Sequence, residues 1–306
     1  GHYAGYNLTS GAANTLIGSE AGDALTIGNY NVAVGQGALG TSVDGDFNTA
    51  VGYKALEDYE DGDGNGHNTA IGNSSQLNAT TGEYNTSLGS LSIGSGATTG
   101  DANVALGYKS GYALTAGAAN TAVGYESLMT EDAHGNNTAL GYSALRVLNA
   151  GAEGYNVAVG VSAGAVMTTG VQNTLIGGLA GDALTTGSYN VAIGKSALST
   201  EDAHGYNTAI GYQALATLDA GADAYNTAVG FNAGTAMTTG VRNTLMGHQA
   251  GDSLTTGARN IAIGYNALST EDAHGRNVAI GYDALKVQDA GADAYNVSVG
   301  YRAGKA

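Results

Sequence analysis

Cysteine and proline are absent from the 306-residue sequence, and lysine and arginine together number only ten. The absence of cysteine excludes disulfide bonds and thiol chemistry. Glycine is frequent, with 51 residues, but without proline and without a continuous Gly-X-Y triplet the chain is not a collagen. The 26 acidic residues give a formal net charge of −16. This balance argues against binding to nucleic acid or to anionic membrane surfaces, because both require clustered Lys and Arg.

Long apolar segments are also missing from the sequence. No stretch approaches the 18 apolar residues of a membrane-inserted helix, and we expect no signal peptide at the start of the sequence. The aliphatic residues are nevertheless too frequent and too regularly spaced for a disordered chain. Their spacing is therefore the feature from which a fold can be predicted.

A five-residue motif dominates the sequence, and one clear copy consists of Asn207, Thr208, Ala209, Ile210 and Gly211. The first residue is always Asn, the second is β-branched, the fourth is a large apolar residue and the fifth is always Gly. The third is Ala or Ser in 14 copies and Leu in three. Recurrence at a short, fixed period indicates a solenoid. The 17 copies begin at Asn14, Asn31, Asn48, Asn68, Asn85, Asn103, Asn120, Asn137, Asn156, Asn173, Asn190, Asn207, Asn226, Asn243, Asn260, Asn277 and Asn296.

The central residues of the motif predict a short strand, because β-branched and aliphatic types favour extended backbone. Asn and Gly at its ends predict turns, since both tolerate positive φ. Alternation places residues two and four on one face and residues three and five on the other. Neither face carries a charge in any copy, and such strands are normally covered on both sides. One face should line the solenoid interior, and something else should cover the other.

The spacing of the motif sets the size of each coil. Eleven of the sixteen intervals are 17 residues, and the others are 18 to 20. Such a coil holds two strands of about five residues and two turns. The predicted fold is all-β, a parallel β-solenoid in the form of a two-layer β-roll. Residues 1–306 form one solenoid of 17 motif-bearing coils, with four-coil super-repeats of 70 residues from about residue 85 to residue 295.

The interior of this roll is thin, so one chain buries little apolar surface per residue. We therefore expect a parallel homo-oligomer in which the doubly apolar strand faces the partner chains. A homotrimeric rod is the simplest closed arrangement for a fibre, although the spacing alone does not distinguish three chains from another number.

The motif followed by Gly-Tyr-Gln-Ala-Leu (residues 211–215) resembles the repeat shafts of bacteriophage tail fibres, particularly those of marine phages. Ala-Leu-Thr-Thr-Gly (residues 183–187) and Tyr-Asn-Thr-Ala-Val-Gly (residues 225–230) carry the same resemblance. The repeats are also similar to the head repeats of trimeric autotransporter adhesins. The resemblance covers residues 14–304 and implies a trimer, a shaft or head role, and host attachment.

Two functions follow from the resemblance as expectations. The first is the structural shaft of a trimeric phage tail fibre in the virion. The expected partners are further copies of the same chain, other fibre or baseplate proteins and a host surface glycan. The alternative is a bacterial adhesin head at the cell surface that binds a receptor along its side. Because the sequence starts at Gly1 without Met and ends inside a coil, we expect a fragment or processed product of a longer fibre.

An acidic segment offers a candidate calcium site. Asp61, Asp63 and Asn65 are each followed by Gly, which resembles the start of a loop whose alternate oxygens converge on Ca²⁺. The Glu expected at the twelfth position is replaced by Gly72. We favour a solvated acidic loop over bound Ca²⁺. The carboxylates that could replace the missing ligand are Glu57, Asp58 and Glu60.

A second acidic motif, Thr-Glu-Asp-Ala-His-Gly, recurs with the 70-residue period. Its side chains are a candidate metal or receptor patch, but copies four coils apart are separated by roughly 19 Å and cannot share an ion within one chain. A turn copied by duplication is the favoured interpretation. The residues are Glu131, Asp132 and His134, then Glu201, Asp202 and His204, then Glu271, Asp272 and His274.

Tyrosines flank many motifs and should form columns along stacked coils. The columns either bind host sugars or brace the solenoid, and bracing is the favoured interpretation. Those before the motif are Tyr155, Tyr189, Tyr206, Tyr225 and Tyr295, and those after it include Tyr125, Tyr142, Tyr212, Tyr265 and Tyr282.

Two short strings resemble catalytic motifs, but we predict no enzymatic activity. Residues 160–164 fit the G-x-S-x-G nucleophile elbow, which requires a strand–turn–helix context. Its Ser162 occupies a variable position that is Asn232 in the next copy. Residues 35–40 fit a dinucleotide-binding string, but no βαβ unit follows.

Overall fold

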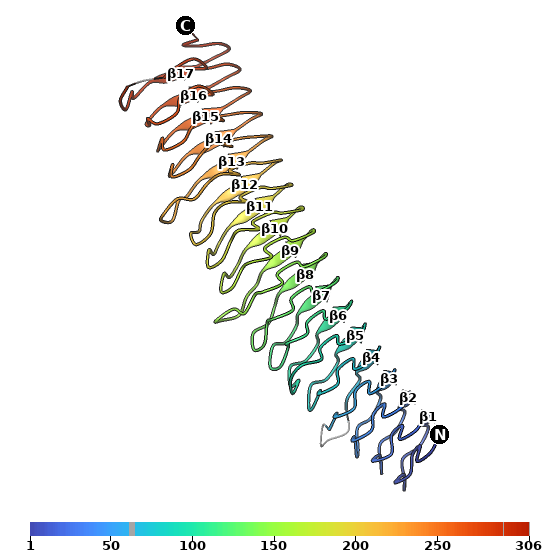
Figure 1. Cartoon of the computed structure of the whole chain (residues 1–306). Helices are drawn as coiled ribbons and strands as arrows, with labels where there is room; N and C mark the ends of the chain where they lie inside the picture. The colour runs from blue at the N-terminus through green and yellow to red at the C-terminus, as the bar shows by residue number, and fades with distance from the viewer. Residues whose placement is uncertain (61–64, 290, 306) are drawn as a thin grey trace. The chain divides into compact units, whose positions relative to one another are not determined.

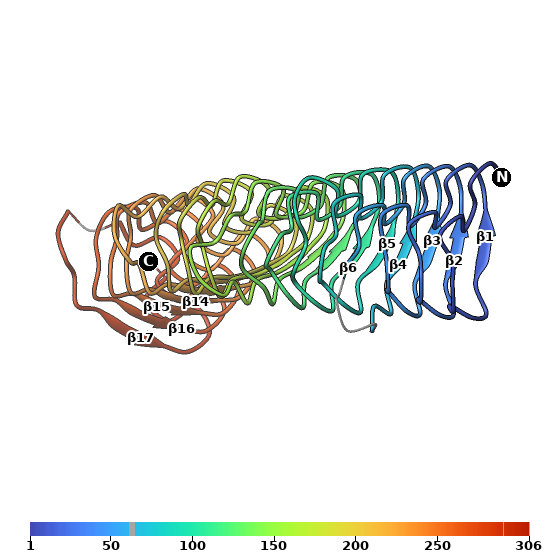
Figure 2. The ribbon, with the colours of Figure 1, turned by 90° about the horizontal axis from the view of Figure 1, so that it is seen from below.

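The computed structural model describes residues 1–60, 65–289 and 291–305. Over these residues the chain is all-β and contains no helix. It is a parallel β-solenoid with about 17 residues per coil, as the motif spacing predicted (Figure 1 and Figure 2). The chain divides into two compact units, Gly1–Tyr155 and Asn156–Ala306.

Each strand consists of residues two to four of one motif. The first unit contains β1 (Thr15–Ile17), β2 (Val32–Val34), β3 (Thr49–Val51), β4 (Thr69–Ile71), β5 (Thr86–Leu88), β6 (Val104–Leu106), β7 (Thr121–Val123) and β8 (Thr138–Leu140). The second contains β9 (Val157–Val159), β10 (Thr174–Ile176), β11 (Val191–Ile193), β12 (Thr208–Ile210), β13 (Thr227–Val229), β14 (Thr244–Met246), β15 (Ile261–Ile263), β16 (Val278–Ile280) and β17 (Val297–Val299).

Within each unit, every strand pairs in parallel with the strand of the next coil, and equal motif positions lie side by side. Thr208 aligns with Thr227, and Ala209 aligns with Ala228. This interval is 19 residues rather than 17, yet the register is unchanged. The extra residues are therefore accommodated in the turns, and the strand register is kept.

The glycine that ends each motif has the positive φ predicted from the sequence. Its φ lies between 131° and 145° in all copies. The glycines also stack closely, because a Cβ built on Gly211 would lie 2.3 Å from the carbonyl oxygen of Gly230. Only glycine satisfies both the backbone angle and the approach of the next coil.

The asparagine that begins each motif has a different role from the predicted one. Positive φ occurs at the preceding residue, such as Tyr206 at 62°, and not at the motif asparagine. The buried Asn173 side chain donates from Nδ2 to the Gly187 carbonyl at 2.9 Å, and its Oδ1 accepts the Asn190 backbone N–H at 2.9 Å. The asparagines thus form a hydrogen-bonded ladder that satisfies buried backbone groups of neighbouring coils.

The prediction of a second strand in each coil is wrong for the described residues. The segment after the motif glycine forms turns in which left-handed residues recur, such as Gln213 at φ 51° and Leu215 at φ 49°. This segment still stacks on the next coil, since the Leu215 N–H donates to the Ala233 carbonyl at 3.0 Å. The second layer is therefore a ladder of turns opposite the sheet.

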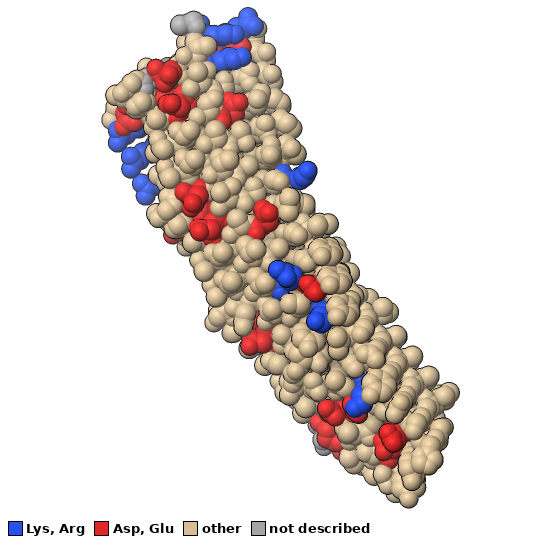
Figure 3. Space-filling model, in the orientation of Figure 1, with Lys and Arg blue, Asp and Glu red and all other residues tan. Residues whose placement is uncertain are grey.

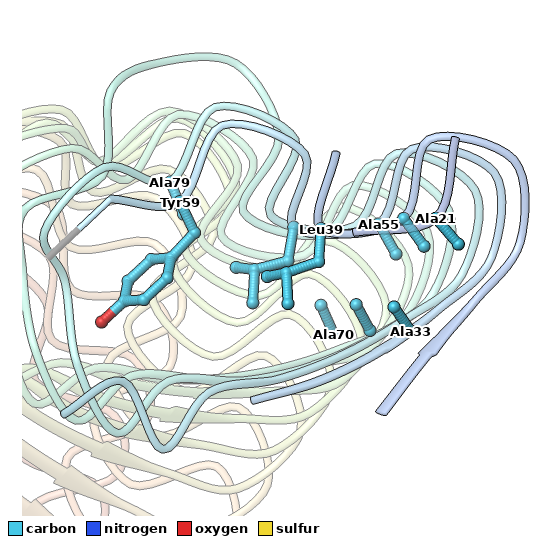
Figure 4. Close-up of a cluster of buried hydrophobic side chains, with 10 residues drawn as sticks. Ala21, Ala33, Leu39, Ala55, Tyr59, Ala70 and Ala79 are labelled. Atoms are coloured by element: carbon cyan, nitrogen blue, oxygen red, sulfur yellow. The ribbon is translucent and has the colours of Figure 1, made fainter. Parts of the chain in front are cut away.

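The core between the two layers is narrow. In Figure 4, Ala33 and Ala70 of the sheet lie opposite Ala21 and Ala55 of the turn layer, and all four are fully buried. Larger side chains fill the wider part, where Tyr59 is also fully buried. The third motif residue is consequently small in most copies, because its Cβ points into the thin part of the core.

Stacking of the motif glycines can be tested by substitution. Gly211→Ala should lower the free energy of unfolding by about 2–4 kcal/mol, because the new Cβ meets a backbone carbonyl and the residue stays at φ 138°. Gly178→Ala is the matched control in the same unit, since its Cβ would meet nothing within 4 Å. The measurement is the urea midpoint of each variant, and equal midpoints would contradict the stacking argument.

Candidate functional site

The outer face of the sheet is a candidate contact surface of each unit. The alanine face points into the core, so the second and fourth motif residues point outward. These outward residues are half-buried or exposed in every strand. Ile17, Leu88, Leu140 and Met246 have exposed fractions of 57%, 48%, 45% and 42%. A single chain therefore presents rows of β-branched and aliphatic side chains without charge.

Two columns of side chains flank these rows, and we call them the preceding column and the following column. The preceding column consists of the residue before each motif asparagine, and the following column consists of the residue after each motif glycine. In the preceding column Tyr189 stacks on Tyr206 and Tyr206 on Tyr225, with ring centroids 5.0 Å apart in both pairs. The predicted stacking on neighbouring coils is confirmed for these three tyrosines and for those named in the following column. Tyr295 instead packs against Arg276, whose guanidinium carbon lies 5.2 Å from the ring centroid.

The stacks extend over several coils and include phenylalanine and histidine. In the first unit, rings stack along Tyr30, Phe47, His67 and Tyr84, and along Tyr108, Tyr125 and Tyr142. In the second unit the following column stacks along Tyr212, Phe231, His248, Tyr265, Tyr282 and Tyr301.

This geometry determines what the tyrosines can contact. Each ring inside a column covers both of its faces with neighbouring rings, so only edges and hydroxyl groups meet the solvent. A sugar that stacks on an aromatic ring requires an uncovered face. The stacks therefore favour the bracing role over sugar stacking.

Arginine replaces the aromatic residues in part of the preceding column, which the motif-based sequence reasoning missed. Arg242, Arg259 and Arg276 occupy this position on three successive coils, with φ of 60°, 60° and 63°. All three side chains are exposed. Their spacing of 17 residues was the signal that could have revealed them, had the residue before each asparagine been compared among coils.

The Glu-Asp-His motif forms a turn around a buried carboxylate. Glu131 is fully buried, its Oε1 accepts the His134 backbone N–H at 3.1 Å, and its Oε2 accepts that of Ala150 at 3.0 Å. Burial raises the pKa of the Glu131 carboxyl, and the two backbone N–H groups oppose this rise. The bond from His134 closes the turn within one coil and the bond from Ala150 joins the next coil, which supports the interpretation as a structural turn.

A potential ligand atom from each of Glu131, Asp132 and His134 lies within 4.8 Å of the others. The same holds for the copy at Glu271, and Asp219 joins the copy at Glu201. The carboxylate is already engaged by backbone donors in each copy, because the Glu201 and Glu271 Oε1 atoms accept from His204 and His274.

Two residues of the calcium candidate, Asp61 and Asp63, lie outside the described residues. Asn65 is described and exposed.

The two catalytic-like strings fall in the ordinary repeat. Ser162 lies in the turn layer with φ 55°, and Gly35 is a motif glycine with φ 138°. Neither string precedes a helix in the part of the chain that the structure describes.

Comparison with protein-family models and with curated proteins finds no match to this chain. None of the described residues belongs to a helix that could cross a membrane.

The buried Glu131 gives a prediction for pH. Folding raises the pKa of the Glu131 carboxyl above its ordinary value of 4.5. At pH values between the ordinary and the raised pKa, the folded state therefore binds more protons at this group than the unfolded state does. The stability that Glu131 contributes should therefore fall as pH rises through this window. Glu131→Gln should remove that part of the pH dependence, measured as urea midpoints at a series of pH values. Parallel pH curves for the two proteins would contradict the prediction.

Proposed function

We propose that this chain is a structural segment of a homotrimeric fibre, namely the shaft of a phage tail fibre that takes part in host attachment. The observation that carries the proposal is the uncharged, uncovered outer face of the sheet. Large exposed apolar patches on soluble proteins generally mark contact surfaces.

Further copies of the same chain are the occupants that fit this face best. The exposed side chains repeat once per coil, in register along β1 to β8 and along β9 to β17. A partner can match such a row over its length only if it has the same coil spacing. Another copy of the chain has the same coil spacing. Burying the half-exposed aliphatic side chain of each coil should stabilise the association by about 1 kcal/mol per coil.

The fibre role rests on the repeat architecture together with the resemblance of the motif to tail-fibre shafts. A solenoid gains length by adding coils without changing its cross-section, which suits a shaft. Such a shaft would be located in the virion and would join other fibre or baseplate proteins. Ca²⁺ at Asp61, Asp63 and Asn65 remains a hypothesis within this proposal.

An adhesin head on a bacterial surface is the second candidate. The arginines of the preceding column favour it, because they offer a binding group on the side of the coils. Segments for a neck, stalk and membrane anchor in the full gene would select the adhesin, and neighbouring baseplate genes would select the fibre.

The trimer is tested by light scattering on the full chain, and a mass of three chains is expected. Ile176→Glu combined with Met246→Glu should give monomers of unchanged circular dichroism, because both side chains are exposed on the outer sheet face. Val161→Glu is the control, since Val161 is 57% exposed but lies outside the strands.

A stable wild-type monomer would contradict the trimer and remove the main support for the fibre. The same measurement with a calcium chelator tests the acidic loop. A trimer that dissociates only after chelation would assign the loop a bound ion.

A further inference from the structure

The arginines of the preceding column form the longest run of basic residues at equivalent positions on successive coils among the described residues, with three members. The chain has ten Lys and Arg residues in all, and three of them are Arg242, Arg259 and Arg276. Basic side chains form a row along one edge of the second unit in Figure 3. Their coils follow one another at the strand spacing of roughly 4.8 Å, so their positive charges repel one another.

Carboxylates of the same chain do not neutralise all three of these arginines. Arg276 pairs with Asp293 and donates to the Tyr295 hydroxyl at 2.7 Å. Among the described residues no carboxylate forms an ion pair with Arg242 or Arg259. Other basic residues have partners, since Lys54 pairs with Glu57, Arg146 with Glu126, and three cations surround Asp283. Two guanidinium groups therefore remain free to bind an external anion.

The preceding super-repeat shows that the fold does not require these arginines. Residues 156–225 are a near copy of residues 226–295, and the equivalent positions carry Gln172, Tyr189 and Tyr206. Their φ values of 57°, 62° and 62° match those of the arginines. The same backbone thus accepts glutamine, tyrosine or arginine, and the charge is a property added to one copy.

A shallow hollow lies beside this column in the first of the two copies. Its lining includes Thr186, Ser188, Tyr189, Tyr206 and Asp223. The equivalent positions in the second copy are Thr256, Ala258, Arg259, Arg276 and Asp293. There, hydroxyl, guanidinium and carboxylate groups occur together along one surface.

We infer that Arg242 and Arg259, with Arg276 beside them, bind an acidic oligosaccharide whose acid groups follow the coils. A guanidinium group binds a carboxylate or a sulfate through two parallel hydrogen bonds. The Thr256 hydroxyl donates to the Ala273 carbonyl, and its oxygen can still accept from a neutral sugar hydroxyl. Asp293, by contrast, is held by the Gly275 N–H and by Arg276. The ligand class is a short saccharide chain that carries carboxylates or sulfates.

Two other anionic polymers fit the site less well. Nucleic acid binding depends on many neutralised phosphates, and three cations on a chain of net charge −16 are too few. An acidic peptide would seek backbone partners, but the N–H groups of Arg242, Arg259 and Arg276 already donate to carbonyls of the preceding coil. The observations therefore favour a carbohydrate.

This inference does not depend on the trimer, because the column lies beside the motif and not within the outer sheet face. The experiment uses the full chain and calorimetric titration at low salt with an oligogalacturonate. A sulfated oligosaccharide separates sulfate from carboxylate recognition, and a neutral maltooligosaccharide of equal length is the ligand control.

The near copy supplies the variants. Arg242→Gln with Arg259→Tyr and Arg276→Tyr installs the residues of the preceding super-repeat and should weaken binding about tenfold or more. The reverse exchange, Gln172→Arg with Tyr189→Arg and Tyr206→Arg, should add a second bound oligosaccharide per chain. Lys109→Gln with Arg146→Gln and Lys195→Gln removes the same charge elsewhere and should leave binding unchanged.

Several results would overturn the inference. Unchanged affinity in the first variant would exclude the column as the site, and equal binding of the neutral sugar would exclude charge recognition. Equal or tighter binding of an oligothymidylate or an oligoglutamate would exclude the carbohydrate class. A loss of oligomer mass in the first variant, with sugar binding intact, would instead assign the arginines to contacts between chains.

Discussion

Every coil of this solenoid must present the same backbone groups at the same height as its neighbours, and this constraint governs the rest of the structure. Two motif residues meet it directly. Gly211 lets the chain approach Gly230 to a distance that no side chain permits. The asparagine side chains carry hydrogen bonds from coil to coil where the backbone alone cannot, as Asn173 does for Asn190. The interior then requires only a small residue between the layers.

Much of the fold could be predicted because these constraints require Asn and Gly at regular intervals in the sequence. The strand positions, the parallel register and the coil length all follow from the spacing of Asn and Gly. The turn layer could not be predicted in the same way. Leu215 and Gly234 occupy equivalent positions in two coils and both have positive φ, 49° and 60°. Leucine at such a position does not indicate a left-handed backbone, so the residue types do not show that the two coils have the same conformation. The role of asparagine was also hidden, since its partners are in adjacent coils rather than in its own motif.

The candidate surfaces were predicted unevenly for a related reason. Frequent residues such as Tyr206 and Tyr225 suggested columns, and stacking at 5.0 Å confirms them. The arginines were missed because they occur at only a few of the equivalent positions. The sequence did not show which face of each strand points into the solenoid, because that depends on the distance between the two layers. Full burial of Ala209, with Ile210 only partly covered, shows that the layers admit a methyl group and leave the larger side chain outside.

The two near copies show which positions of such a repeat are free to acquire function. Ala158 and Ala228 are identical and fully buried, as are Ala163 and Ala233 in the turn layer, because the thin core between the two layers admits only small side chains there. In the preceding column, by contrast, Tyr189 and Arg259 keep the same φ within 2° and exchange an aromatic ring for a charge. The backbone at this position accepts either residue, but Tyr189 also stacks on Tyr206, so the exchange replaces ring stacking between coils with repulsion between charges. Of the two near copies, only residues 226–295 carry arginines in the preceding column, so this position can acquire charge while its backbone conformation is kept.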